Sequence, residues 1–224
     1  MSAPIRTHNL SVRYGREVTL HYPDLNLEAG AALAITGPSG SGKTTLLHVL
    51  AGLLRPASGE VAYGNLNLGA VPEAAREAFR RRHMGYVFQD FHLMPGLSAL
   101  ENVELGLRVA GAEQPRARAR AALIRLDLGH RLNHRPVHLS TGERQRVAVA
   151  RAVAHGPGLL LVDEPTAHLD RNRARAALEL LLGAAADLDA TLIVVTHDPV
   201  VAEALPARLD LGAPAPVSRA LVST

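Results

Sequence analysis

Three short runs of apolar residues stand out along the chain, at residues 31–36, 159–162 and 191–195. Each is four to six residues long and is made of aliphatic residues and threonine, a pattern typical of strands buried on both faces. The first run leads through a glycine-rich turn into a helical stretch that we expect to reach about Leu54. An alanine- and leucine-rich stretch near residues 173–186 is predicted to be a helix between the other two runs. Alternating strands and helices predict an α/β fold with a mainly parallel sheet covered on both faces.

A polar or glycine-rich cluster follows each predicted strand. The clusters begin at Gly37, Asp163 and Thr196. In a parallel sheet the carboxyl ends of the strands meet at one edge, and ligands bind there. We therefore expect the three clusters to converge on a single site.

The middle of the chain differs from the rest in composition and in its pattern of apolar residues. It is rich in arginine, alanine and leucine with helical spacing, and it has few strand signals. We expect a helical subdomain at residues 91–156, inserted into an α/β core that is made of residues 1–90 and 157–224. Together these parts form one predicted domain, 1–224.

The composition excludes several classes of protein. Cysteine is absent, which excludes disulfides, cysteine-ligated zinc and thiol catalysis, and which fits a reducing compartment. No apolar run approaches the roughly 18 residues that a membrane span requires, and the first residues include no apolar core of a secretory signal. We expect a cytoplasmic protein whose association with a membrane runs through a partner.

Basic residues gather in two places, at residues 76–82 and 116–125, although the formal net charge is only +3. Such clusters are either solvated helix faces or patches that bind nucleic acid or lipid, and we expect solvated helix faces here. Aromatic residues make up 3% of the chain and do not interleave with the basic ones, so we expect no nucleic-acid partner.

The first polar cluster fits the phosphate-loop pattern G-x-x-x-x-G-K-[ST] between a strand and a helix. Glycines let backbone N–H groups close around phosphate oxygens, and the helix directs its positive end at them. Lys43 would neutralise the β- and γ-phosphates, and the Thr44 hydroxyl would ligate Mg²⁺. The alternative is a glycine-rich turn with an incidental lysine. The predicted nucleotide contacts are Gly37, Pro38, Ser39, Gly40, Ser41, Gly42, Lys43, Thr44 and Thr45.

Two acids follow the second predicted strand. A carboxylate at the end of a buried strand is costly unless it holds a metal or a hydrogen-bonded partner. Asp163 suits Mg²⁺, and Glu164 suits the polarisation of an attacking water. Paired acids at this position also serve as simple helix caps. The phosphate loop upstream favours the catalytic interpretation.

The stretch that starts at Ser140 is predicted to be a capped helix. Ser140 at the N-cap and Glu143 three residues later form a capping box, and the helix is expected to continue to about Ala154. The capping box alone accounts for these residues, without any role in binding. A helix N-terminus also attracts anions, but the residues alone do not say which anion.

Together, the phosphate loop, the helix start at residues 140–146 and the segment 162–170 resemble the nucleotide-binding subunits of ABC transporters. The resemblance runs from about Ile5 to Pro199. It implies a phosphate-loop NTPase core with an N-terminal antiparallel β part, and a homodimer that sandwiches two ATP molecules with Mg²⁺. Ser140 and Gly142 would then contact the γ-phosphate of the ATP that the neighbouring chain binds.

The resemblance also implies roles for residues that are ambiguous by themselves. Tyr14 would stack on adenine, although it also suits an ordinary strand position. Gln89 would link Mg²⁺ and the lytic water to the helical subdomain, His197 would contact the γ-phosphate, and Asp170 would lie on a loop that crosses the dimer interface. The implied catalytic residues are Glu164, His197, Gln89 and Lys43, and the implied metal ligands are Thr44, Gln89 and Asp163.

One residue departs from the family pattern. Thr141 stands where the signature usually has glycine, which alters the closest approach of this backbone to phosphate, and we expect weaker binding across the interface. Gly142 is retained, so we do not infer a dead enzyme.

The expected function is to drive integral-membrane permease subunits from the inner face of the cell membrane by binding and hydrolysing ATP. Residues 89–105 resemble the branch of the ABC family that serves lipoprotein release and macrolide or peptide export. Residues 91–96 include apolar side chains beside Gln89, which we expect to contact the permease. A regulatory complex that signals to cell-wall enzymes, and an ABC ATPase that acts on nucleic acid or ribosomes, are the alternatives.

Overall fold

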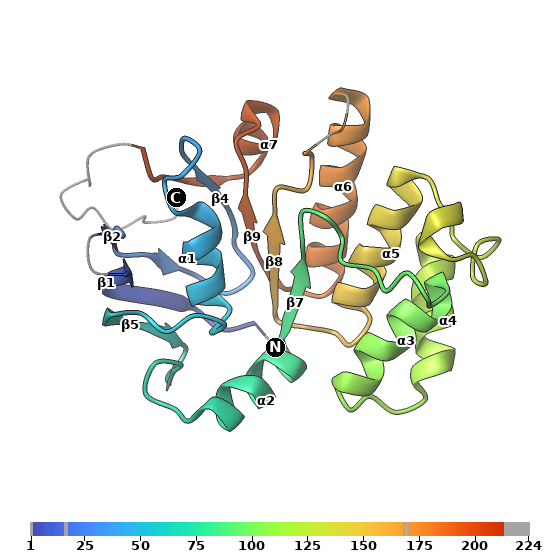
Figure 1. Ribbon diagram of the computed structural model, residues 1–224, viewed down its shortest axis with the longest axis horizontal. Helices are drawn as coiled ribbons and strands as arrows, with labels where there is room; N and C mark the ends of the chain where they lie inside the picture. The colour runs from blue at the N-terminus through green and yellow to red at the C-terminus, as the bar shows by residue number, and fades with distance from the viewer. Residues whose placement is uncertain (1, 16–17, 168, 170, 213–224) are drawn as a thin grey trace.

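The computed structural model describes residues 2–15, 18–167, 169 and 171–212. Within these ranges, strands and helices alternate along most of the chain (Figure 1). The elements are β1 (Ile5–Tyr14), β2 (Val18–His21), β3 (Asn26–Leu27), β4 (Ala32–Thr36), α1 (Lys43–Leu50), β5 (Ser58–Tyr63), β6 (Leu66–Asn67), α2 (Glu73–His83), β7 (Met84–Val87), α3 (Ala99–Val109), α4 (Pro115–Arg125), the 3₁₀ turn η1 (Pro136–His138), α5 (Thr141–Val153), β8 (Leu159–Asp163), α6 (Arg171–Asp187), β9 (Thr191–Val195), α7 (Pro199–Ala204) and β10 (Ala207–Asp210).

A five-stranded parallel sheet forms the centre of the molecule. Its strand order is β10-β4-β9-β8-β7, and every pair of neighbours is parallel. The three apolar runs of the sequence form β4, β8 and β9, and every residue of β8 and β9 is buried. Successive residues of one strand face different layers, because Leu161 packs in the cluster that contains α1, whereas Leu160 packs in the cluster that contains α6. The predicted α/β fold class is confirmed.

A second, antiparallel sheet lies beside the first, with α1 between the two (Figure 1). Strands β2, β1, β5 and β6 pair in that order, and β3 pairs with β1. Ile5 of β1, Leu47 of α1 and Ile193 of β9 are fully buried in a single cluster. Each such side chain contributes about 1.5–3 kcal/mol by leaving water. This cluster therefore fixes α1, and the loop before it, between the two sheets.

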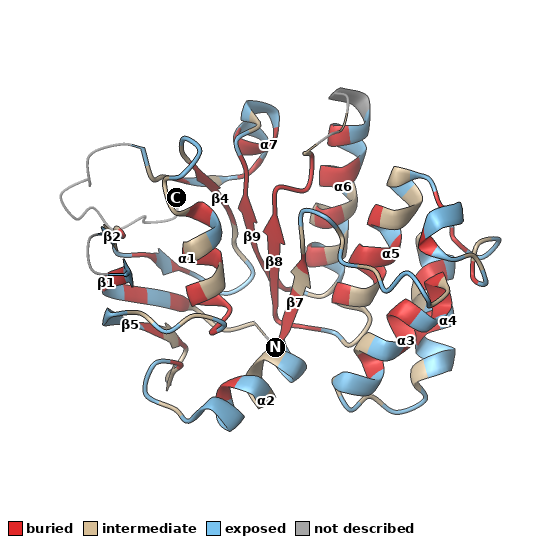
Figure 2. Ribbon diagram, in the orientation of Figure 1, coloured by how far each residue is buried: buried red, intermediate tan, exposed pale blue. Residues whose placement is uncertain are grey.

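Helices α3, α4 and α5 form a separate layer at the far edge of the parallel sheet (Figure 2). Leu107, Leu123 and Val147, one from each helix, are fully buried in their own cluster. Helix α5 also packs on β7, where Gly85 leaves no room for a Cβ against the Ala152 carbonyl. The helical layer is thus anchored to the strand that leads to Gln89.

The capping box predicted at the start of α5 is present. The Ser140 hydroxyl accepts a hydrogen bond from the Glu143 N–H at 3.3 Å, and the Glu143 carboxylate accepts one from the Ser140 N–H at 2.8 Å. The prediction for α1 was wrong at its end, since α1 stops at Leu50 and not at Leu54. Gly52, at a φ of 63°, takes the chain out of the helix there.

The first basic cluster is not wholly a solvated face. Arg76 on α2 is only 4% exposed and bonds to Glu73, so the expectation of solvent exposure was wrong for this residue. Arg80 of the same helix donates to the Gly52 carbonyl at 2.6 Å. Arg80 thus ties α2 to the turn that follows α1. In the second cluster, the arginines on α4 are exposed. Within the described ranges, no helix is both long enough and apolar enough to cross a membrane.

Candidate nucleotide-binding site

The loop between β4 and α1 depends on glycine. Gly37, Gly40 and Gly42 have φ values of 147°, 80° and 90°, which residues with side chains rarely adopt. A Cβ on Gly42 would lie 2.7 Å from the Tyr22 hydroxyl oxygen, so this position also has no room for one. The sequence of the loop therefore permits a turn that larger residues would prevent.

Lys43 reaches back across this loop. Its ammonium group donates to the carbonyls of Gly37 at 2.9 Å and Pro38 at 3.1 Å, and the residue is buried. The buried hydroxyl of Ser41 has no hydrogen-bond partner within the described structure. The N-cap of α1 has no side-chain hydrogen bond either, so the first N–H groups of the helix can bind an anion. These three features fit a phosphate group in the loop.

Thr44 and Asp163 place two oxygen atoms side by side. The Thr44 hydroxyl donates to Oδ1 of Asp163 at 3.2 Å. Burial raises the pKa of Asp163 above its usual value, the negative charge of Glu164 raises it further, and the bond from Thr44 partly offsets both. A buried carboxylate beside a hydroxyl suits a hard divalent cation, which prefers oxygen ligands. This donor set fits Mg²⁺.

Glu164 and His197 form a hydrogen-bonded pair. Oε2 of Glu164 accepts from the His197 backbone N–H at 3.1 Å and lies 2.9 Å from Nδ1 of its ring. The two residues follow β8 and β9, which are neighbours in the sheet, so strand pairing brings them together. Glu164 has a φ of 45°, a strained conformation that costs about 1–3 kcal/mol. Its N–H donates to the Val195 carbonyl at 2.9 Å, which helps to hold that conformation.

Most of the predicted residues share one cleft of about 450 Å³. Tyr14 is half exposed at its edge and its hydroxyl lies 2.7 Å from the Thr45 hydroxyl. His197 instead borders a second hollow, which Gly37 and Pro38 also line. The cleft is lined by Tyr14, Val18, Leu20, Ser39, Gly40, Gly42, Lys43, Thr44, Thr45, Gln89 and Glu164.

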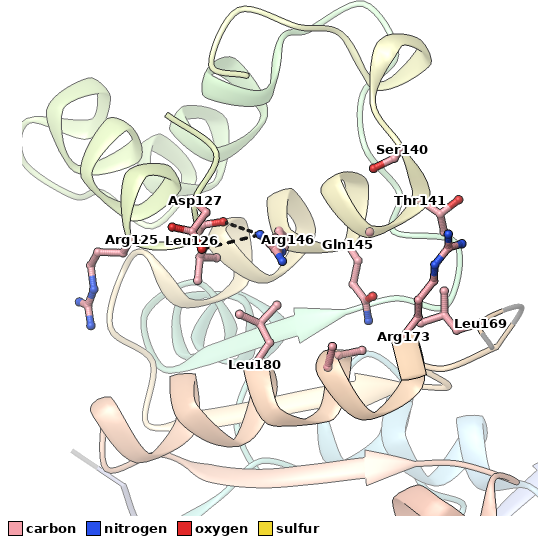
Figure 3. A pocket seen from close by; sticks show the side chains of 13 residues that line it. Arg125, Leu126, Asp127, Ser140, Thr141, Gln145, Arg146, Leu169, Arg173 and Leu180 are labelled. Atoms are coloured by element: carbon pink, nitrogen blue, oxygen red, sulfur yellow. Dashed lines mark hydrogen bonds and ion pairs between the residues drawn. The ribbon is translucent and has the colours of Figure 1, made fainter. Parts of the chain in front are cut away.

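The start of α5 lies in a different place. Ser140, Thr141 and Gly142 line a hollow of about 400 Å³ between α5 and α6 (Figure 3). The Thr141 hydroxyl accepts from Nη2 of Arg144 at 3.1 Å, so the unusual threonine of this motif is bonded within its own helix. One chain therefore does not bring Ser140 and Gly142 into the cleft of Lys43. Asp170 lies outside the described residues.

Several residues of the site escaped the sequence analysis. Val18 and Leu20 line the cleft beside Tyr14, and the Tyr22 hydroxyl donates to the Gly42 carbonyl at 3.1 Å. Nothing in the local sequence singles them out, because their role depends on the pairing of β1 with β2. The contact between Glu164 and His197 was also missed. The prediction that both follow parallel strands, whose carboxyl ends meet at one edge of the sheet, was a signal that could have found it.

Known proteins match this chain over most of its length. The family described as ABC transporter matches residues 20–167. The lipoprotein-releasing system ATP-binding protein LolD of Chromohalobacter salexigens is 47% identical over 181 residues, which cover 80% of this chain and 76% of that protein. LolD of Idiomarina loihiensis is 43% identical over 209 residues, or 91% of this chain and 92% of that protein.

A solved structure agrees with these matches. It is described as a dimeric, post-hydrolysis state of the ATP-binding cassette MJ0796 bound to ADP and Pi. Its TM-score is 0.81 at 37% sequence identity, and the match covers 93% of this chain and 94% of that chain. The fold, the phosphate loop and the sequence matches agree, and the chain belongs to the ABC transporter family as an ATP-binding, ATP-hydrolysing subunit.

Proposed function

We propose that two copies of this chain close around two ATP molecules and reopen after hydrolysis. The observation that carries this proposal is the division of the site. The cleft of Lys43, Gln89 and Glu164 lies apart from the hollow that contains Ser140 and Gly142. A second copy in head-to-tail orientation supplies the missing half to each cleft. The dimeric state of the cassette MJ0796 supports this arrangement.

Within each cleft the chain's own residues bind and orient the nucleotide. The glycine-rich loop and Lys43 hold the phosphates, and Lys43 exchanges its two carbonyl partners for phosphate oxygens. Tyr14, half exposed at the edge of the cleft, is placed to stack on the adenine ring. Thr44, Asp163 and Gln89 are the residues that would hold Mg²⁺, which would neutralise negative charge on the phosphates.

Glu164 and His197 are the proposed residues of the hydrolytic step. Glu164 lines the cleft and is mostly buried, so its carboxylate can accept a hydrogen bond from the attacking water. His197 fixes Oε2 of this carboxylate through both its backbone and its ring, while the ring stays 68% exposed and can turn to a γ-phosphate. Asp170, from the sequence pattern, belongs to the dimer interface.

The proposed partner is an integral-membrane permease on the inner face of the cell membrane. Two relatives are named as lipoprotein-releasing ATP-binding proteins, which supports the export or release branch. A groove of about 490 Å³ lies beside Gln89 and is lined in part by Phe91 and Leu93, and Met94 next to it is half exposed. We propose that residues 91–156 carry the permease contact and that residues 1–90 and 157–224 carry the nucleotide.

The test uses Glu164→Gln to trap the closed state. The variant, carrying an affinity tag, is incubated with ATP and Mg²⁺ in detergent-solubilised membranes of its own cell, and the copurifying proteins are identified. ADP in place of ATP is the control. An integral membrane protein recovered with ATP supports the proposal. Recovery of ribosomes or of non-membrane partners alone would overturn the permease assignment and leave the ATPase assignment intact.

A further inference from the structure

Arg151 holds the chain just after Gln89. It lies in the last turn of α5, the helix that begins at the signature residues. Its guanidinium donates through Nη2 to the Phe91 carbonyl and through Nη1 to the His92 carbonyl, both at 2.6 Å. One side chain therefore bridges two consecutive peptide groups of the loop that follows Gln89.

The residues around Arg151 favour its hydrogen bonds to these two carbonyls. Burial lowers the pKa of Arg151, and no carboxylate of the described residues lies within ion-pairing distance of it. A cation that loses water in this way needs hydrogen-bond acceptors in its place, and the two carbonyls provide them. On α3, Gly106 leaves space for the stem, since a Cβ there would lie 3.0 Å from Cγ of Arg151.

The two carbonyls that Arg151 binds belong to residues in a strained conformation. Phe91 and His92 have φ values of 60° and 44°, which are unfavourable for side chains of this size. The same turn is closed by the Phe91 N–H, which donates to the Phe88 carbonyl at 3.0 Å. The His92 ring stacks on the Phe88 ring at a centroid distance of 4.6 Å. Gln89 is thus presented by a tight, strained turn that Arg151 holds from α5.

We propose that Arg151 is a positioning residue for Gln89, which couples the place of Gln89 in the cleft to the position of α5. When α5 moves as a rigid helix, Ser140 at one end and the Gln89 turn at the other move together. The inference rests on the proposed role of Gln89 in the hydrolytic site. It adds that this role depends on a residue that touches neither the nucleotide cleft nor the hollow at Ser140.

The test is a double-mutant comparison of ATPase activity. Arg151→Lys keeps the charge and the aliphatic stem, but a single ammonium cannot reproduce the planar fork that reaches both carbonyls. We expect kcat to fall about tenfold, with a smaller change in the KM for ATP, because a small displacement of a positioned group is costly to the chemical step. In a Gln89→Ala background, the same change should produce no further loss.

The matched control is Arg118→Lys. Arg118 also donates to a carbonyl at the end of α5, that of Ala154 at 2.9 Å, but among the described residues it makes no hydrogen bond to the Gln89 turn. This variant should keep the wild-type kcat. Gly106→Ala displaces Arg151 without changing it, because the new Cβ on α3 would crowd Cγ of Arg151. Alanine also favours the helix, so α3 itself should be preserved. Gly106→Ala should reproduce the loss of kcat even if Arg151→Lys does not fold.

The outcomes separate two failures. If the losses of kcat from Arg151→Lys and Gln89→Ala multiply in the double variant, the positioning role is overturned. A loss of kcat in Arg118→Lys equal to that in Arg151→Lys would also overturn it, and so would an unchanged kcat in Gly106→Ala. Unchanged activity of Gln89→Ala alone would overturn the proposed role of Gln89 and this inference with it. A loss in Arg151→Lys that vanishes in the Gln89→Ala background supports the inference.

Discussion

Replacement of Glu164 by glutamine should separate nucleotide binding from hydrolysis. In the structure, Oε2 of Glu164 accepts two hydrogen bonds from His197, at 3.1 Å from the backbone N–H and 2.9 Å from the ring. The amide oxygen of glutamine can accept both, so the local fold should survive. Hydrogen bonds to a charged group exceed neutral ones by about 1 kcal/mol each, so the free energy of unfolding should fall by at most about 2 kcal/mol.

The catalytic effect should be larger and of a different kind. Glutamine cannot accept a proton from water, and the loss of a general base slows a reaction by about 10² to 10⁴-fold. This corresponds to about 2.7–5.4 kcal/mol in the activation free energy at 1.36 kcal/mol per tenfold. Phosphate release measures turnover, and calorimetry on the same sample measures the Kd for ATP, which should stay within about threefold of wild type.

A control carboxylate lies on the helix that follows. Glu179 on α6 is exposed, pairs with Arg175 at 3.4 Å and does not line the cleft of Glu164. Glu179→Gln should leave turnover unchanged. Wild-type turnover in Glu164→Gln, or an equal loss in both variants, would refute the assignment of Glu164 as the base.

Two further predictions concern the supporting structure. In Gly42→Ala, the left-handed backbone and the overlap with Tyr22 cost about 2–5 kcal/mol, so the melting temperature should fall by about 4–20 °C. Gly96→Ala is the control, because a Cβ there meets nothing within 4 Å, and equal melting temperatures would contradict the account. Hydrogen bonds from Ser140 lower the pKa of Glu143 from 4.5 to about 2, so Glu143 stabilises the fold above pH 4.5 and this stability is lost as the pH falls towards 2. The difference in unfolding free energy between wild type and Glu143→Gln should therefore shrink on acidification, and a difference that does not change with pH would argue against the capping role.

The sheet and the phosphate loop could be predicted because their signals are local. The run at 191–195 is apolar after Thr191 and became β9 with the same bounds. The capping box at Ser140 is also encoded within four residues of sequence. The side-chain pattern fixes burial in the sheet, and burial fixes which strand ends meet. The end of α1 was less predictable, since leucines at 53 and 54 continue the apolar pattern after Gly52 has ended the helix.

Contacts between distant segments could not be predicted in the same way. Arg76 belongs to a run of arginines that suggests a solvated face, yet the packing of α2 buries it. In the sequence, nothing distinguishes Arg151 from the other arginines of α5. Only the course of the loop after Gln89 gives it two carbonyl partners. The division of the site between two hollows depends on the position of the whole helical layer, which no local pattern specifies.

The most direct test of the central claim uses a property of this chain, in which Lys43 is the only lysine. An amine-specific acylating reagent therefore has a single ε-amino target, and mass spectrometry follows its rate of modification against a lysine-containing peptide added as an internal reference. If the phosphates of ATP replace the carbonyls of Gly37 and Pro38 as partners of Lys43, ATP with Mg²⁺ at 100 times its Kd should slow modification by about 100-fold. An unchanged rate in the presence of saturating ATP would contradict the claim that this loop binds the phosphates.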